Sequence, residues 1–207
     1  MFISLEGPEG SGKTSQMPLL AEFLSQRGYC VICTREPGGT PISDQIREVL
    51  VSMKNQDLRP RTEILLFLAS RAQLVDQLIR PALAEGKIVI CDRFGDSTLA
   101  YQGYGHGLPL DQLRQMLAFA TGGLTPDLTL YLDLDVECGL KRKQEAQDWN
   151  RLDAYALDFH RRVRQGYLCL AAEEPERWRV INASQGREAV QTAMRQAVTE
   201  KLMESQG

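Results

Sequence analysis

The chain has 207 residues, 43% of them hydrophobic and 25% charged, which is an ordinary composition for a globular protein. This length predicts a single domain over 1–207. A net charge of -3 argues against non-specific binding of nucleic acid or of an anionic membrane surface. No uncharged apolar run approaches the ~18 residues of a membrane span, and the first predicted strand directly follows Met1. We therefore expect a cytoplasmic protein without a signal peptide.

The cysteines do not suggest a disulfide scaffold, because their number is odd and most fall in apolar stretches. Cys30 and Cys33 form a CxxC, the spacing of redox pairs and half zinc sites. No second CxxC accompanies it, and neither His106 nor His160 lies at a ligand-like spacing. In a strand the two thiols would point to opposite faces, which is poor geometry for one metal. We predict reduced core cysteines at positions 30, 33, 91, 138 and 169.

Short apolar runs alternate with amphipathic stretches of helical length along the whole chain. The runs predict strands at 2–7, 29–34, 87–92, 127–134 and 178–183. The stretches predict helices at about 13–27, 41–53, 61–85, 109–121, 136–146, 153–173 and 186–204. Such alternation favours an α/β fold, a parallel sheet with helices on both faces. Ligands in these folds bind at the carboxyl ends of strands, here the loops after Leu5, Thr34, Cys91, Leu134 and Ala183.

The first of these loops is a phosphate-binding motif. Residues 7–14 read GPEGSGKT, a complete GxxxxGK[ST] between a predicted strand and a predicted helix. The glycines let backbone N–H groups turn toward phosphate oxygens, and the helix N-terminus adds partial positive charge. Lys13 then reaches the β and γ phosphates, and the Thr14 hydroxyl binds Mg²⁺. The predicted nucleotide contacts are Gly7, Pro8, Glu9, Gly10, Ser11, Gly12, Lys13 and Thr14.

The remaining sequence narrows the class of nucleotide-binding protein. The NKxD motif of a GTPase and the LSGGQ motif of an ABC-type ATPase are both absent. A small-molecule kinase is therefore favoured, and it must also hold an acceptor. Phe67 and Arg71 lie at i,i+4 on one face of the helix predicted at 61–85, where a ring stacks on a base and a guanidinium bonds its edge. Alternatively, this stretch is simply core, with Arg71 solvated at its margin.

The third predicted strand ends in Asp92 and Arg93, beside the phosphate loop. Asp92 is placed to order the water shell of Mg²⁺, and Arg93 to hold the phosphate being transferred. A structural ion pair between them is the competing interpretation.

Four further motifs make the comparison specific: TREPGGT at 34–40, LLFLASRAQ at 65–73, DRFGDSTLAYQG at 92–103 and LDLDVECGLKR at 132–142. Together with the phosphate loop, this ordered set resembles the bacterial thymidylate kinases over nearly the entire chain. The resemblance implies a P-loop NTPase fold with a five-stranded sheet and a short lid. It also implies a homodimer that transfers the γ phosphoryl of ATP to dTMP.

The resemblance assigns roles to individual residues. Phe67 matches the aromatic that stacks on thymine, and Arg71 the residue that bonds its edge. Tyr101 matches the tyrosine near the deoxyribose, where a 2'-OH is unwelcome, and Gln102 a nearby polar contact. The remaining matches are Arg93 near the acceptor phosphate, Glu9 near the acceptor sugar and metal, and Arg35, Glu36 and Pro37 in the acceptor-side loop.

The chain departs from the family near residue 150, where Asn150-Arg151-Leu152-Asp153 replaces the usual Asp-Arg pair followed by Glu. The lid is expected at about 141–153, and residues 8–11 supply no arginine of their own. We therefore predict Arg151 as the catalytic cation on the phosphoryl group and Arg142 along the adenine, the alternative being a solvated charged helix. Two other functions remain open: a kinase for another pyrimidine monophosphate, and a non-catalytic nucleotide-binding regulator.

Overall fold

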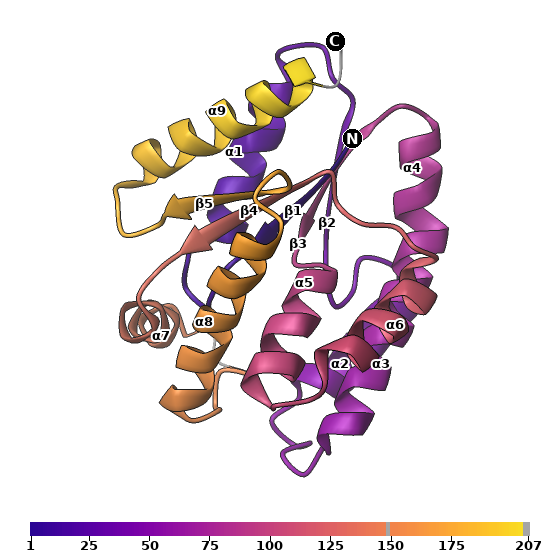
Figure 1. Cartoon of the computed structure of the whole chain (residues 1–207), viewed down its shortest axis with the longest axis vertical. Coiled ribbons are helices and arrows are strands. Elements are labelled where there is room, and N and C mark those ends of the chain that lie inside the picture. Colours follow the sequence, from indigo (N-terminus) through magenta and orange to yellow (C-terminus); the bar gives the residue numbers. More distant parts are fainter. Residues whose placement is uncertain (148–149, 205–207) are drawn as a thin grey trace.

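The computed structural model describes residues 1–147 and 150–204 and is built around one parallel sheet (Figure 1). Its strand order is β2-β3-β1-β4-β5. The strands are β1 (Phe2–Glu6), β2 (Val31–Arg35), β3 (Ile88–Asp92), β4 (Leu128–Asp133) and β5 (Trp178–Asn182). All neighbouring strands run parallel, so the α/β fold predicted from the alternating pattern is confirmed.

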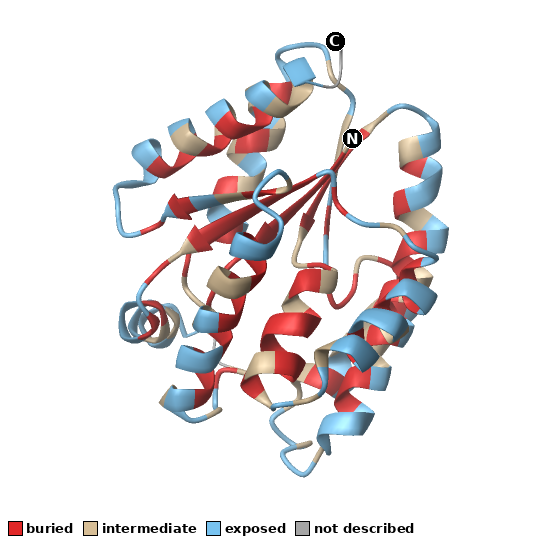
Figure 2. Ribbon diagram, in the orientation of Figure 1, coloured by how far each residue is buried: buried red, intermediate tan, exposed pale blue. Residues whose placement is uncertain are grey.

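Helices cover both faces of the sheet. Consecutive residues of β1, β3 and β4 are buried, and because they point to opposite faces, both faces must be covered. On one face, Ile3 and Leu130 pack with α1 (Lys13–Ser25) and α9 (Arg187–Glu204). On the other face, Tyr131 packs with α8 (Leu157–Glu173) and with α6 (Leu110–Thr121), while Phe2 belongs to a neighbouring cluster. Figure 2 shows the buried residues concentrated along the strands and the inner sides of these helices.

The long helix predicted at 61–85 forms in three segments. They are α3 (Pro60–Leu74), a π-helical segment at Val75–Ile79, and α4 (Arg80–Ala84). The widened turn lies just before Pro81, whose nitrogen carries no hydrogen for a regular helical bond. The shorter helices α2 (Pro41–Val51) and α7 (Val136–Glu145) lie close to their predicted positions.

One helical segment was not predicted. Residues 92–103 contain α5 (Gly95–Thr98) and most of a second π-helical segment at Leu99–Gly105. This segment packs closely on α8, and Leu99, Ala100 and Tyr101 are buried there. Tertiary burial therefore stabilises a helix in a glycine-containing stretch of weak intrinsic propensity.

The cysteine prediction was wrong for most positions. Only Cys91 is buried, Cys169 is half-buried, and Cys30, Cys33 and Cys138 are exposed. Cys30 and Cys33 belong to β2 or its approach, and β2 is an edge strand whose residues are mostly not buried. All five thiols are free, as predicted.

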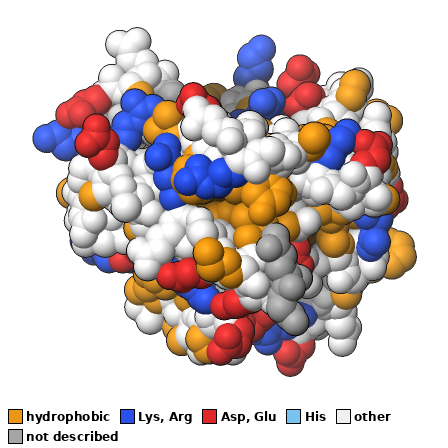
Figure 3. All heavy atoms as spheres, turned by 90° about the horizontal axis from the view of Figure 1, so that it is seen from above, with side chains coloured by type: hydrophobic (Ala, Val, Ile, Leu, Met, Phe, Trp, Pro, Cys, Tyr) orange, Lys and Arg blue, Asp and Glu red, His pale blue; other side chains and the backbone are white. Residues whose placement is uncertain are grey.

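The surface carries mixed charge. On the face shown in Figure 3, acidic and basic side chains are interspersed with hydrophobic ones. Within the described residues, no helix has the length and apolar character to cross a membrane.

Candidate active site

A cleft of about 800 Å³ opens at the carboxyl ends of β1, β2 and β3. The phosphate loop forms one side, and α3 with the second π-helical segment forms the other. The predicted site residues that line it are Glu9, Gly10, Gly12, Lys13, Thr14, Arg35, Glu36, Pro37, Phe67, Arg71, Asp92, Arg93, Tyr101, Gln102 and Arg142. Gly7, Pro8 and Ser11 lie in the phosphate loop behind this lining. The loop after Ala183, which was expected to contribute, supplies no lining residue among those described.

The phosphate loop depends on glycine at two positions. Gly12, the residue before α1, has φ 94°, a left-handed conformation that glycine adopts without strain. A Cβ on Gly10 would lie 2.2 Å from the carbonyl oxygen of Gly139, so the loop packs directly on the backbone of α7. The first turn of α1 therefore faces the cleft, where its N–H groups favour an anion.

Lys13 spans the loop it follows. Its Nζ donates to the carbonyl oxygens of Gly7 and Pro8 at 3.0 and 3.1 Å, and to Ser11 Oγ at 3.3 Å. Burial and the neighbouring Arg93 guanidinium lower the pKa of Lys13 to about 8. Both causes disfavour the charged form, and a bound phosphate would restore it. An anionic ligand beside Lys13 would therefore stabilise its ammonium group.

The side-chain oxygens of Thr14 and Asp92 are suitable ligands for Mg²⁺. Thr14 Oγ1 lies 3.2 Å from Asp92 Oδ2, at the mouth of the phosphate loop. The described residues contain no cluster of three or more acidic, histidine or cysteine side chains that could hold a metal by itself. Mg²⁺ in phosphotransfer sites takes one or two protein oxygens together with waters and substrate phosphates, and the Thr14–Asp92 pair offers such oxygens.

Arg93 is the central cation of the cleft. Its φ of 70° is rare outside glycine and places the side chain off the end of β3. Arg93 Nη2 lies 2.6 Å from Glu9 Oε1, and the guanidinium lies 5.0 Å from the Tyr101 ring centroid. The predicted alternative, a pair between Asp92 and Arg93, is not the arrangement found, because Asp92 bonds Thr14 instead.

Glu9 connects the phosphate loop to the opposite wall. Burial alone would raise the pKa of Glu9, but Arg93 and Lys13 outweigh it and lower the pKa to about 2. Tyr101 Oη also donates to Glu9 Oε1, at 2.9 Å. Glu9 is therefore an ionised acceptor at neutral pH, and it fixes both Arg93 and Tyr101 at the centre of the cleft.

Arg71 is buried, with 1% of its surface exposed, so the predicted alternative of a solvated arginine is excluded. Its Nε donates to Glu36 Oε2 at 2.7 Å, Nη1 to Thr98 Oγ1 at 2.9 Å, and Nη2 to the carbonyl of Phe94 at 3.0 Å. Phe67, one helical turn earlier, is half-buried and lines the cleft. An aromatic face and a fixed guanidinium edge thus border the same space.

The structure places Arg151 elsewhere. Arg151 is absent from the lining of the cleft and only 4% exposed. Nε donates to the carbonyl of Leu50 at 2.7 Å, Nη1 to Tyr155 Oη at 3.0 Å, and Nη2 to Glu63 Oε2 at 2.5 Å. These bonds turn the guanidinium into the protein interior, so Arg151 does not meet the phosphoryl position in this structure.

Two other cations of the expected lid line the cleft. Arg142 Nη1 lies 3.3 Å from the carbonyl oxygen of Gly10, and Lys143 pairs with buried Asp153 at 3.4 Å. Burial and Glu9 raise the pKa of Asp153 to about 6. The expected lid, 141–153, includes residues 148–149, which lie outside the described part of the chain.

Several lining residues were missed from sequence. Arg47, on α2, lines the cleft and donates to the carbonyl of Pro37 at 3.0 Å. Burial and the neighbouring Arg35 lower the pKa of Arg47. Thr98 and Lys143 also border the cleft. Arg47 lies on the helix that directly follows the TREPGGT motif, and no motif or spacing in the sequence indicates that it is a site residue. The Glu36–Pro37 peptide bond within that motif is cis.

Comparison with known proteins gives one consistent result. The model of a family described as "Thymidylate kinase" matches residues 5–194. A thymidylate kinase of Roseiflexus castenholzii is 52% identical, with 92% of this chain and 89% of that protein covered. One from Thermomicrobium roseum is also 52% identical, covering 97% and 95%. The crystal structure of thymidylate kinase from Ehrlichia chaffeensis superimposes with a TM-score of 0.79 at 37% identity, covering 96% of this chain and 98% of that one.

Proposed function

The chain belongs to the thymidylate kinase family and phosphorylates dTMP with ATP as donor; we propose that the transfer takes place in the cleft described above. The observation that supports this best is that one cavity of about 800 Å³ contains both the phosphate loop and the Phe67–Arg71 wall. Arg93 lies between the two, bonded to Glu9 and close to the ring of Tyr101. Donor and acceptor phosphates therefore meet beside one cation.

The donor side consists of the phosphate loop and the lid. We assign the β and γ phosphates to the loop N–H groups and Lys13, which would exchange its carbonyl bonds for phosphate oxygens. Arg142 and Lys143, rather than Arg151, are the proposed lid cations, because they line the cleft. Arg142, bonded to Gly10, also borders the space left for the adenine.

The acceptor side consists of Phe67, Arg71, Tyr101 and Gln102. Phe67 stacks on the thymine and Arg71 bonds its edge with the hydrogen of Nη1 that Thr98 leaves unused. Tyr101, held by Glu9, occupies the space where a ribose 2'-OH would lie. Arg35, 54% exposed in its side chain, closes the acceptor side from β2.

Mg²⁺ is the proposed metal, bound directly by Thr14 and through water by Asp92. Held there, it would neutralise part of the negative charge of the donor phosphates. The residues of the chain position the reactants and provide the other cations. A strong general base is unnecessary, because the acceptor phosphate is already largely dianionic at neutral pH, with a second pKa of about 6.

The decisive experiment is an acceptor panel with the purified protein. ADP release in the presence of Mg²⁺ and ATP should be fastest with dTMP, slower with dUMP and near background with CMP and AMP. Faster transfer to another pyrimidine monophosphate would reassign the acceptor. ATP binding without ADP release on any acceptor would instead indicate a nucleotide-binding regulator.

We also propose that the protein is a homodimer, assembled through the outer face of α3 and α6. Phe119 on α6 is 92% exposed and Leu65 on α3 is 58% exposed, and these two helices pack side by side. Large exposed apolar side chains on adjoining helices are typical of a protein interface. We further propose a cytoplasmic location, because nucleotide substrates are charged and do not cross membranes unaided.

Light scattering coupled to size exclusion tests the dimer. Phe119→Asp should convert the dimer to a monomer. Met203→Asp should leave it intact, although Met203 on α9 is also exposed, at 68%. A monomeric wild-type protein, or a dimer that survives Phe119→Asp, would rule out this interface.

A further inference from the structure

A buried carboxylate lies directly behind the catalytic arginine. Glu6, the last residue of β1, is 0% exposed and does not line the cleft. Its Oε1 accepts from the backbone N–H of Phe94 at 2.8 Å. Its Oε2 accepts from Ser97 Oγ at 2.6 Å and from Tyr167 Oη at 2.8 Å. Both oxygens therefore face donors only.

The two hydroxyls bonded to Glu6 are also the ones that hold Arg93. Arg93 Nη1 donates to Ser97 Oγ at 3.3 Å and to Tyr167 Oη at 3.1 Å. A guanidinium only donates, so each hydroxyl must direct its own hydrogen elsewhere. The two hydroxyl oxygens also lie 2.8 Å from each other, so at least one of the two hydrogens is donated to Glu6 Oε2, and the hydroxyl oxygens remain open toward Arg93. Glu9 holds the other terminal nitrogen, Nη2, from the opposite side.

From this geometry we propose that Glu6 is a positioning residue for phosphoryl transfer: it sets the direction of the Ser97 and Tyr167 hydroxyls, which in turn aim Arg93 at the transferred phosphate. The inference rests on the role proposed above for Arg93. Arg93 has a positive φ at the end of β3, a strained conformation that persists only when surrounding contacts hold it. Two fixed acceptors on Nη1 and one on Nη2 define the plane of its guanidinium.

An amide at position 6 cannot replace the carboxylate. Glu6→Gln has nearly the same shape, but one of its two polar atoms is an NH₂ donor. If that NH₂ faces Phe94, two hydrogen-bond donors meet, the NH₂ and the backbone N–H. If it faces Ser97 and Tyr167 instead, their hydroxyl hydrogens lose the oxygen that accepted them. Either orientation breaks the arrangement that fixes Arg93.

The test is a double-mutant cycle on kcat at pH 8, where the Glu6 carboxyl, with its pKa of about 7, is mostly ionised and can only accept. Glu6→Gln should lower kcat about tenfold or more, the usual effect of losing a partner that orients a catalytic group, while the KM for ATP changes little. In an Arg93→Ala background the same substitution should have almost no further effect on kcat. A merely structural role would lower kcat by the same factor in both backgrounds, and that result would overturn the proposal.

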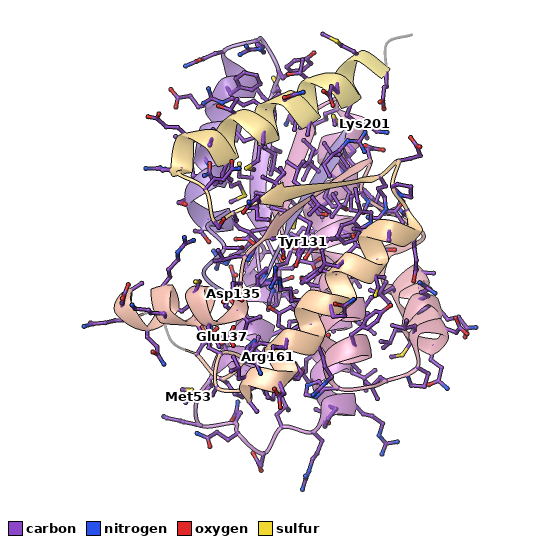
Figure 4. All side chains as sticks on the ribbon, turned by 60° about the vertical axis from the view of Figure 1, so that its left-hand side comes forward. Met53, Tyr131, Asp135, Glu137, Arg161 and Lys201 are labelled. Atoms are coloured by element: carbon purple, nitrogen blue, oxygen red, sulfur yellow. The ribbon has the colours of Figure 1, made fainter. Side chains whose placement is uncertain are left out.

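A second pair of variants keeps the test valid if Glu6→Gln folds poorly. Tyr167→Phe removes one hydroxyl link to Arg93 and should lower kcat. Tyr131→Phe is the matched control: Tyr131, on β4 beside α8 (Figure 4), stacks on Tyr167 at 5.0 Å but its hydroxyl bonds Asp133. The control should retain kcat. Equal losses in both variants would overturn the positioning role, whereas full activity of Arg93→Ala would overturn the role of Arg93 itself.

Discussion

Arg151 Nη2 lies 2.5 Å from Glu63 Oε2, and the two side chains are 4% and 1% exposed. Burial alone would raise the pKa of Glu63, but bonds from His106 and Arg151, among others, lower it to about 2. The other oxygen, Oε1, accepts from Gln102 Nε2 at 2.9 Å. Glu63 therefore joins the C-terminal end of the expected lid to Gln102 of the acceptor wall, and Arg151 serves as its counter-ion.

Arg151→Ala should therefore act mainly on stability. Removing one partner of a buried ion pair leaves an uncompensated charge, so the free energy of unfolding should fall by about 3 kcal/mol. For a chain of this size the melting temperature should drop by roughly 6–12 °C. The kcat of the folded variant should fall by less than about tenfold. Calorimetry and steady-state kinetics below the new melting temperature measure both quantities.

Arg142→Ala is the matched comparison, because Arg142 is exposed, bonds Gly10 and lines the cleft. It should reduce kcat with little change in melting temperature. If Arg151→Ala instead lowers kcat by about 10² to 10³ and Arg142→Ala does not, then Arg151 leaves Glu63 during turnover and is the lid cation after all.

Lys13→Ala should abolish transfer while leaving dTMP affinity largely intact. Among the described residues, Lys13 Nζ bonds only the phosphate loop, so its proposed ligands are donor phosphates. Isothermal titration with dTMP and with ATP separates the two sites. A loss of dTMP affinity as large as the loss of ATP affinity would contradict the assignment of Lys13 to the donor side.

Phe67→Ala should weaken dTMP binding by about 1–3 kcal/mol, the contribution of base stacking on an aromatic ring, with little change for ATP. Phe67 is half-buried and lines the cleft, so its ring is accessible there. Leu68→Ala is the control for core packing, since Leu68 is the buried neighbour on the same helix. It should lower the melting temperature more than it lowers dTMP affinity. The reverse pattern would assign Phe67 to the core.

The sequence predicted those parts of the site that lie close together along the chain. GPEGSGKT and the strands around it form a local unit. The i,i+4 spacing put Phe67 and Arg71 on one helix face but left open whether that face was core, and it was the family resemblance that assigned both to the acceptor site, where they line the cleft. The fold class followed from the alternation of apolar runs and helical stretches. Each of these predictions depended on periodicity or on a contiguous motif.

Contacts across long sequence separations were not predictable in the same way. Glu6 and Tyr167 are 161 positions apart, and Glu63 and Arg151 are 88 apart. Arg151 lies in a charged segment that resembled a solvated lid, and two of its acceptors, Leu50 and Glu63, belong to the distant helices α2 and α3. Cys30 and Cys33 failed for a related reason: an apolar run predicts a strand but not whether that strand is at the edge of the sheet.

The pH dependence of stability gives the last prediction. Burial and the neighbouring Asp96 raise the pKa of Glu6 to about 7, from about 4.5 when unfolded. Between these values the folded state binds more protons than the unfolded state, so the contribution of Glu6 to stability falls as pH rises. Below pH 4.5 both states are protonated, and above pH 7 the cost of burying the charge is complete. The charged or titratable groups around Glu6 are Asp96, Arg93, Tyr167, Lys13 and Cys91.

Urea unfolding at pH 5.0 and 7.5 measures this contribution. The wild-type protein should lose stability between the two values, with Glu6 contributing on the order of 3 kcal/mol. Asp153, with its pKa of about 6, adds a loss of the same sign that ends at lower pH. Glu6→Gln should be less stable than wild type at pH 5.0 but should lose less stability between pH 5.0 and 7.5, because its side chain does not titrate.

Asp153→Asn should retain the Glu6 contribution above pH 6. Parallel pH profiles for wild type and Glu6→Gln would show that Glu6 does not titrate in this range, whereas a flat profile in Asp153→Asn alone would assign the dependence to Asp153.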